Sequence, residues 1–240
     1  ISPGDGPLQW IVGLYQYHEQ VKQNQGIRVP LQMQLATPRV APTMPTVFGP
    51  PNPDHNLQIS GAFMDSDAHA IFGQIDYNFS PNWKTTIGVR YTEDTKDAEE
   101  YRTRVLYGVA GVPYAFYAPG EIDRRSPLNG EWSATTGTAG LEWTPNDDTL
   151  TYVKYTRGYK CGGFNAGAFA PDRTSYTEPE YINSYEVGLK QTFFQRLTAN
   201  LSVFHYDYKD AQYPSTVRDP VSNINESRFF NLDEAVSQGV

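Results

Sequence analysis

The chain has 240 residues with a formal net charge of −8, and aromatic residues make up 14% of it, with 17 Tyr and 12 Phe. The acidic balance argues against nucleic acid as a partner, because the sequence has no basic stripe that would neutralise phosphates. A lone cysteine, Cys161, excludes an internal disulfide, and no apolar run reaches the about 18 residues that a membrane-spanning helix requires. Tyrosine-rich strands suit a protein that meets both lipid and water, while a secreted β-rich domain is the alternative that composition leaves open.

The first predicted element is a strand from Leu8 to Gln20, where aromatic and β-branched residues are mixed with polar ones and no helix cap is present. The chain starts at Ile1 without Met, a basic segment or an apolar segment, so we expect any export signal to have been removed or to lie upstream. Val21 to Ala68 contains a dense cluster of prolines from Pro42 to Pro53, which disfavours central strands. We therefore predict that Val21 to Ala68 is mostly a long loop.

Two short strands then form the first predicted hairpin. From Ala70 to Ser80 apolar and polar residues alternate, with Phe72 as the one apolar residue on the polar side. A tight turn at Pro81 follows, and alternation resumes from Trp83 to Thr92. The less polar side comprises Ile71, Ile75, Tyr77, Phe79, Trp83, Thr85, Ile87, Val89 and Tyr91. One face of this hairpin is therefore suited to lipid or to a protein core, and the other to water.

Two more predicted hairpins follow a charged segment and a Gly- and Tyr-rich segment, which extend over residues 93–104 and 107–120. The second hairpin joins Glu131–Trp143 to Thr149–Lys160 through a short turn near Asn146. The third joins Ile182–Phe194 to Arg196–Asp210 through a tight turn around Gln195. Residues 231–240 resemble a loop that leads into one more strand. The count is seven full strands and an incomplete eighth.

Loop lengths alternate along the chain. Short turns near Pro81, Asn146 and Gln195 alternate with long connections, which we place at residues 21–68, 94–130, 161–180 and 211–232. Membrane barrels have short turns on the periplasmic side and long loops outside the cell. The pattern therefore predicts an all-β fold, namely an antiparallel transmembrane β-barrel segment of meandering hairpins, although three hairpins of a soluble meander can show the same alternation.

Four stretches carry a resemblance to a known family. They are GVRYTEDTK at residues 88–96, YVKYTRGYKCGGFN at residues 152–165, SYEVGLK at residues 184–190 and FHYDYKDAQ at residues 204–212. In this order and spacing they resemble the barrel of TonB-dependent outer-membrane receptors, and residues 8–20 are similar to an earlier strand of that barrel. The resemblance covers more than half of the chain.

The resemblance implies a barrel of about 22 strands that encloses an N-terminal plug domain. It also implies a location in the bacterial outer membrane, contact with outer-membrane lipid, and energy-coupled import of a scarce small molecule such as a ferric siderophore, haem, cobalamin or a sugar. In the family, coupling to TonB uses an N-terminal segment. Neither that segment nor a plug is visible in residues 1–240, and the closing strands are also absent, so we expect this chain to be a partial barrel.

No motif for catalysis or for a resident cofactor is present. The histidines at 18, 55, 69 and 205 have no metal-ligand spacing, and no HExxH, CxxC or P-loop motif occurs. We therefore predict no metal site, no cofactor and no enzymatic activity.

Ligand contacts, if the chain makes them, are expected in the long loops. Aromatic side chains give a large contact area at low entropic cost, and arginines pair with anions. The candidates are Tyr107, Tyr114, Phe116, Tyr117, Phe164, Arg102, Arg124 and Arg125. The competing interpretation is that these residues only pack the loops.

Two other functions stay open at this point. A passive porin or structural barrel would have the same strands without a plug. A soluble β-rich module, for example one that binds glycans, would fold in buffer without detergent.

Overall fold

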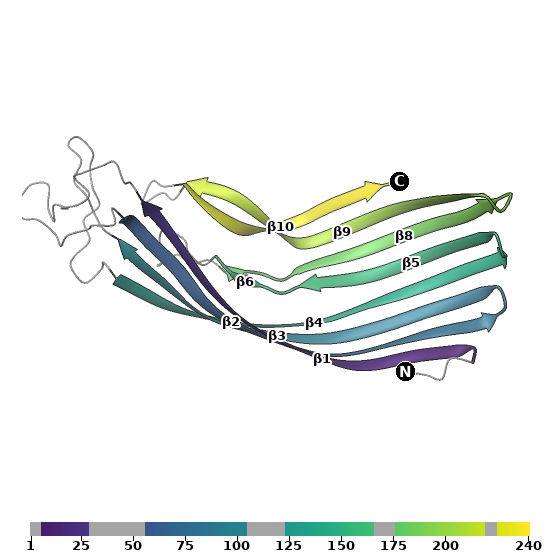
Figure 1. The fold of residues 1–240 in the computed structure, drawn as a ribbon, viewed down its shortest axis with the longest axis horizontal. Helices are drawn as coiled ribbons and strands as arrows, with labels where there is room; N and C mark the ends of the chain where they lie inside the picture. The colour runs from purple at the N-terminus through teal and green to yellow at the C-terminus, as the bar shows by residue number, and fades with distance from the viewer. Residues whose placement is uncertain (1–5, 29–55, 105–122, 166–175, 219–224) are drawn as a thin grey trace, which may run out of the picture.

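The computed structural model describes residues 6–28, 56–104, 123–165, 176–218 and 225–240 (Figure 1). In these residues all regular secondary structure is β-strand. The strands are β1 (Leu8–Arg28), β2 (Asn56–Ser80), β3 (Trp83–Arg104), β4 (Asp123–Asn146), β5 (Thr149–Lys160), β6 (Gly163–Phe164), β7 (Tyr176–Thr177), β8 (Glu180–Phe193), β9 (Leu197–Arg218) and β10 (Asn225–Gly239). Among the described residues, no helix is long and apolar enough to cross a membrane.

Eight of the strands form one antiparallel sheet in the order β1-β2-β3-β4-β5-β8-β9-β10, and β6 pairs with β7 in a separate two-stranded sheet. Each strand of the large sheet therefore pairs with its neighbour in sequence, except that β6 and β7 are inserted between β5 and β8. This is the predicted meander of hairpins, and the prediction of an all-β antiparallel fold is confirmed.

The three predicted tight turns are present, and all lie at the same end of the sheet (Figure 1). The Asn82 amide donates to the Ser80 hydroxyl at 3.3 Å, and the Asp148 amide donates to the Asn146 side chain at 3.0 Å. Between β8 and β9, Phe194 and Gln195 both have a φ of 54°. Two left-handed central residues are the geometry of a type I′ turn, which matches the twist of the flanking strands.

The strands are longer than the sequence predicted. Our assignment of residues 21–68 as mostly loop is wrong for 21–28 and 56–68, which belong to β1 and β2; residues 21–28 pair with residues 56–64. Residues 96–103 and 123–130 likewise pair as the ends of β3 and β4, and β9 and β10 pair at residues 211–218 and 225–232. The long connections are therefore shorter than we placed them, because polar and charged residues dominate most of these extensions, and the prolines of residues 42–53 favour a loop for the whole segment that contains them.

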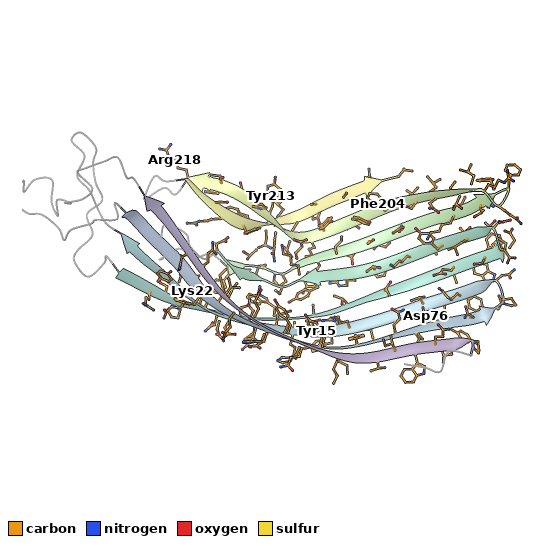
Figure 2. The ribbon with its side chains drawn as sticks, in the orientation of Figure 1. Tyr15, Lys22, Asp76, Phe204, Tyr213 and Arg218 are labelled. Atoms are coloured by element: carbon orange, nitrogen blue, oxygen red, sulfur yellow. The ribbon has the colours of Figure 1, made fainter. Side chains whose placement is uncertain are left out.

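The two faces of the sheet differ in exposure. We call the face on which β6 and β7 lie the inner face, and the opposite one the outer face. The buried side chains are on the inner face, and include Ala62, Ala70, Ala98 and Ala134. Outer residues of the same strands, such as Val89, are exposed, with 57% of Val89 accessible. Side chains of both faces are drawn in Figure 2, where Asp76 is near the short-turn end and Lys22 is towards the other end.

Candidate functional site

The outer face carries a continuous apolar band across the short-turn half of the sheet. Leu14 of β1, Ile71 of β2 and Tyr91 of β3 are opposite one another in register near its upper limit, where "upper" means towards the end away from the short turns. The band consists of exposed apolar side chains, and Leu14 is 82% accessible. Its other members include Trp10, Val12, Ile75, Ile87, Val89, Val153, Val187, Leu189, Leu201 and Val203.

Aromatic rings mark the lower limit of this apolar band, near the short turns. Trp83 stacks on Trp143 with ring centroids 5.8 Å apart and on Phe79 at 6.2 Å. Eight residues separate Trp83 from Tyr91, which corresponds to about 26 Å along a strand and about 20 Å along the normal for a tilt of about 40°. An apolar band of about this height, with aromatic residues at its rims, is typical of a membrane barrel.

The inner face at the same level is polar and internally paired. Thr86 donates to Asp76, which also accepts a bond from Gln74 at 3.1 Å. Lys84 pairs with Glu142 at 2.9 Å. The face that cannot be lipid-exposed therefore consists of groups suited to a water-filled or protein-filled interior.

The position of Arg90 explains why one apolar residue, Phe72, lies on the polar side of the first hairpin. Its guanidinium is 5.9 Å from the centre of the Phe72 ring and 4.7 Å from the centre of the Tyr15 ring. Stacking against a cation gives these inner aromatic rings a favourable electrostatic contact.

A segment that includes β6 and β7, which we call the inner segment (residues 161–165 and 176–178), lies across the inner face above the band. On one side, Lys96 of β3 donates to the Gly162 carbonyl at 2.9 Å. On the other side, Asn165 donates to the Phe229 carbonyl at 2.9 Å and accepts from the Phe229 amide at 2.7 Å. The inner segment is therefore held to both β3 and β10.

Two more side-chain amides hold the inner segment on the side of β9 and β10. Gln212 of β9 donates to the carbonyls of Cys161 at 2.8 Å and Glu178 at 2.9 Å. Asn231 of β10 accepts from the Glu178 amide at 2.8 Å and donates to the Glu178 carbonyl at 2.9 Å. The inner segment does not pair with the strands of the large sheet. Hydrogen bonds from side-chain amides hold it there instead.

Aromatic rings cluster on the inner segment. Phe164 is 6.0 Å from Trp132 of β4 and 5.3 Å from Tyr176, centroid to centroid, and the second pair is edge-on. The Lys96 ammonium is 5.7 Å from the centre of the Trp132 ring. Tyr176 is 51% exposed, so this cluster presents aromatic surface on the inner face.

Tyr159 turns towards the same region from the end of β5, beyond the apolar band. Burial and the neighbouring Asp94 carboxylate together raise the pKa of the Tyr159 phenol. The Tyr159 ring packs on Tyr181, with ring centroids 5.5 Å apart. The result is a further aromatic pair next to the inner segment.

The structure places only part of the predicted ligand-contact set. Phe164 lies in β6, in the aromatic cluster described above. Arg125 lies in β4, where it forms an exposed ion pair with Glu99 of β3. Arg102 and Arg124 are opposite each other in the register of β3 and β4. Tyr107, Tyr114, Phe116 and Tyr117 lie outside the described residues.

Sequence reasoning missed Trp132, Tyr176 and Lys96 as members of this cluster. Trp132 and Lys96 have one available signal, since both fall on the inner face once alternation is continued through the strand extensions. Tyr176 has no such signal, because it comes near Phe164 only through the pairing of β6 with β7.

The sheet and its two faces define a class of protein: a wall with an outer apolar band, aromatic rims and a polar inner face is the wall of an outer-membrane β-barrel. The family model described as TonB dependent receptor-like, beta-barrel matches residues 8–240. The chain therefore belongs to the TonB-dependent receptor β-barrel family, whose members are proteins of the bacterial outer membrane.

Solved structures share this fold at low sequence identity. The ferric yersiniabactin uptake receptor FyuA from Yersinia pestis is 15% identical with a TM-score of 0.64, over 88% of this chain and 27% of that one. The ferric-catecholate import receptor Fiu from E. coli K12 is 13% identical with a TM-score of 0.55, over 97% of this chain and 32% of that one. The Serratia marcescens hemophore receptor HasR, solved with HasA and heme, is 13% identical with a TM-score of 0.51, over 96% of this chain and 39% of that one. The chain spans well under half the length of each of these receptors.

Proposed function

We propose that this chain is part of the barrel wall of an active importer, and that the whole receptor carries a scarce small molecule such as a ferric siderophore across the outer membrane. The barrel would have about 22 strands and enclose a plug domain. Energy would come from TonB through an N-terminal region. No reaction is assigned to the wall, because its task is to hold the receptor in lipid and to line the path of the ligand.

The observation that carries this proposal is the inner segment. Chain folded across the inner face supplies a fixed surface there, and a receptor needs such a surface on which a ligand is recognised. Anchors on β3, β9 and β10 fix the position of Phe164 and Tyr176. Fixed aromatic rings bind ligands at low entropic cost.

The ligand class is supported by chemistry and by the relatives. Aromatic rings on the inner face suit a ligand with flat apolar groups, such as an aromatic siderophore or haem. The names of the three structural relatives refer to ferric yersiniabactin, ferric catecholates and haem with its hemophore. We place a ferric siderophore first, and haem, cobalamin and sugars after it.

The test is uptake in a strain that lacks other importers and produces the complete receptor containing this chain. We expect growth on one ferric siderophore when iron is limiting, and no growth when TonB is removed. Growth that continues without TonB would instead support a passive pore. If no siderophore, haem, cobalamin or sugar is taken up, the import proposal is wrong.

The role of the inner segment is tested by Tyr176→Ala. We expect ligand affinity to fall by roughly tenfold, since contact aromatics commonly contribute more than about 1 kcal/mol. Tyr213→Ala is the matched control, because Tyr213 has a similar exposure of 58% but is on the outer face. Equal affinity of the two variants would remove the inner segment from the binding site.

A further inference from the structure

A groove crosses the outer face of the sheet within the apolar band. It has a volume of about 970 Å³ and follows two adjacent rows of outer side chains across the strands from β3 to β10. Its floor is a row of short side chains, in which Val153 of β5, Val187 of β8 and Val203 of β9 are opposite one another in register. The next row towards the short turns has the longer side chains of Leu189 and Leu201. The valines are therefore shorter than the side chains around them, which leaves the space of the groove.

Aromatic rings line the upper side of this groove. The Tyr155 and Tyr185 ring centroids are 5.2 Å apart, and the Tyr185 and His205 ring centroids are 6.5 Å apart. The Tyr155 hydroxyl donates to Asn183 Oδ1 at 2.9 Å, so the polar tip of this ring points away from the valines. Clefts of about 300–1,000 Å³ with an apolar lining and a few polar groups are typical ligand sites. The groove has the size and the lining of such a site.

The groove rises from the middle of the apolar band to its upper limit. Counted from the short turns, which all lie at one end of the sheet (Figure 1), Ile87 is the fifth residue of β3 and His205 is the ninth residue of β9. Both residues line the groove. Four residues correspond to about 13 Å along a strand and about 10 Å along the normal for a tilt of about 40°, and one leaflet has about 15 Å of hydrocarbon. The groove therefore crosses most of one leaflet and ends level with Tyr91, the ninth residue of β3.

Arg157 supplies a cation at the upper end of the groove. It is the ninth residue of β5, counted in the same way, and therefore lies level with Tyr91. It is two residues beyond Tyr155 on the same face, and its guanidinium is 4.9 Å from the centre of the Tyr181 ring. The headgroup layer begins at this level and occupies about 5–8 Å above the hydrocarbon. A long arginine side chain at the rim keeps its charge in that layer.

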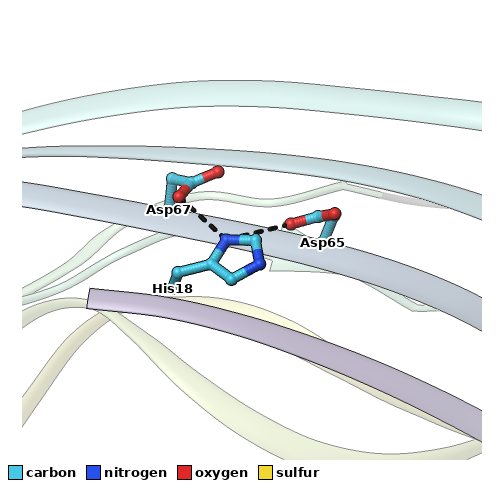
Figure 3. Close-up of side chains that lie close together, drawn as sticks. All are labelled: His18, Asp65 and Asp67. Carbon is cyan, nitrogen blue, oxygen red and sulfur yellow. Dashed lines mark hydrogen bonds and ion pairs between the residues drawn. The ribbon is translucent and has the colours of Figure 1, made fainter.

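Among the described residues, no carboxylate pairs with Arg157. Asp207 is in the same row, two strands away, and pairs with His205 at 2.8 Å. On the outer face of β1 and β2, by contrast, polar side chains pair with one another, and His18 Nδ1 is 3.0 Å from Asp67 Oδ1 (Figure 3). Within the part of the chain that the structure describes, Arg157 is therefore an exposed cation that is available to an external anion.

We propose that this groove binds one lipid of the outer leaflet, with an acyl chain along the valine row and a headgroup phosphate on Arg157. The occupant is a lipid because the groove is continuous with the surface that contacts hydrocarbon. It carries a phosphate because the N–H donors of a guanidinium match the oxygens of that group in pairs. The bound lipid would give the barrel a fixed partner at one position of its circumference, in addition to general contact with the bilayer.

The first experiment counts lipids on the complete receptor in detergent by native mass spectrometry, with phosphatidylglycerol as the probe. We expect the wild type to retain one molecule. Val187→Trp fills the floor of the groove and should lower the affinity by at least about tenfold, since displacing two or more buried methylene groups has an effect of that size. Val89→Trp is the matched control, because Val187 and Val89 are 55% and 57% exposed and are each the seventh residue of their strand from the short turn, but Val89 does not line the groove. Equal affinities in the two variants would exclude the groove as the lipid site.

The second experiment tests the phosphate. Diacylglycerol with the same acyl chains has no phosphate, so the wild type should bind it at least about tenfold more weakly than phosphatidylglycerol, as expected for the loss of hydrogen bonds to a charged group. Arg157→Gln should remove this preference. Lys22→Gln removes an outer cation of β1 away from the groove and should keep the preference. A preference that persists in Arg157→Gln would overturn the phosphate contact.

A second copy of the chain is the alternative occupant of the groove. If the wild type is a dimer in detergent that retains no phosphatidylglycerol, and Val187→Trp makes it a monomer, the groove is a protein interface and the lipid proposal is wrong. Ligand uptake through the receptor is measured separately, so either result leaves the import proposal to its own test.

Discussion

The two halves of the sheet are built differently above the apolar band. In β3 and β4, which have 22 and 24 residues, pairing continues from Trp83↔Trp143 to Thr103↔Asp123. β5 has only 12 residues, and its pairing with β4 ends at Gly137↔Arg157. Beyond that point β4 and β5 separate, and the chain after β5 crosses the inner face instead.

This difference separates the part of the wall that only supports the barrel from the part that adds a surface to the inner face. Long paired strands satisfy their own backbone groups by ladder hydrogen bonds and leave nothing for the interior. Where β5 stops pairing with β4, the side-chain amides of Gln212 and Asn231 form hydrogen bonds with backbone carbonyls of the inner segment. The inner segment is thus the part of the described chain that changes the shape of the inner face.

The largest effect is expected in the apolar band, on which both halves depend. Ile87→Arg places a charge four residues from both Trp83 and Tyr91, near the middle of the band, and should cost about 2–4 kcal/mol in the free energy of unfolding. Thr95→Arg is the control, since Thr95 lies on the same face four residues beyond Tyr91 and should cost less than about 1 kcal/mol. Urea unfolding in lipid bilayers measures both. Equal costs would mean that the band is not the lipid-facing surface.

Substitution of two glycines by alanine compares the two halves of the sheet directly. A Cβ on Gly137 of β4 would lie 2.6 Å from the Gly88 carbonyl oxygen, and a Cβ on Gly162 would lie 2.6 Å from the Thr177 carbonyl oxygen. The Cβ on Gly162 would also lie 2.4 Å from the Trp132 indole, and relieving the contacts at either glycine costs about 1–3 kcal/mol. Gly137→Ala should lower the unfolding free energy of the whole wall, whereas Gly162→Ala should release only the inner segment. Hydrogen exchange of the β3–β4 amides separates these outcomes, and the comparison fails if Gly162→Ala loosens them too.

A smaller effect is expected at the β10 anchor. Asn165→Ala removes both of its hydrogen bonds to Phe229 and should cost about 1–2 kcal/mol, seen as faster proteolysis of the inner segment. Asn165→Asp keeps the acceptor and loses the donor, so its cleavage rate should lie between those of the wild type and Asn165→Ala. An aspartate that is cleaved as fast as alanine would show that the Phe229 amide contributes nothing.

The smallest effect is expected for Lys84→Met on the inner face of the paired half. Its ion pair with Glu142 joins side chains that are 37% and 36% exposed, so solvent screens it and the loss should stay below about 1 kcal/mol. The same unfolding titration measures it. A loss of several kcal/mol would show that this part of the inner face is drier than its exposure suggests.

The membrane half of the fold was predictable because one simple rule governs it. Residues such as Ile75 and Ile87 face outward opposite each other, and the polar residues between them face inward, so a period of two is visible in the sequence. The extensions could not be found in this way. In β1 beyond Leu14, for example, the polar residues His18 and Lys22 occupy outer positions, so the apolar side of the alternation ends there.

The candidate site was less accessible to sequence reasoning than the fold. Phe164 was among the expected contacts because aromatic residues after a strand end suggest a loop surface. Its neighbour Trp132, and Phe229, to which the adjacent Asn165 is hydrogen-bonded, come from distant strands, and only the sheet order brings them together.

The short turns have a further consequence for the order in which the wall assembles. Two or three residues close each of the hairpins β2–β3, β4–β5 and β8–β9, so forming these pairs costs little loop-closure entropy. Pairs such as β3–β4 join residues much farther apart in the chain at their nearest ends. Local contacts form fastest, and we therefore expect the hairpin to be the kinetic unit: three hairpins form early and then join side by side.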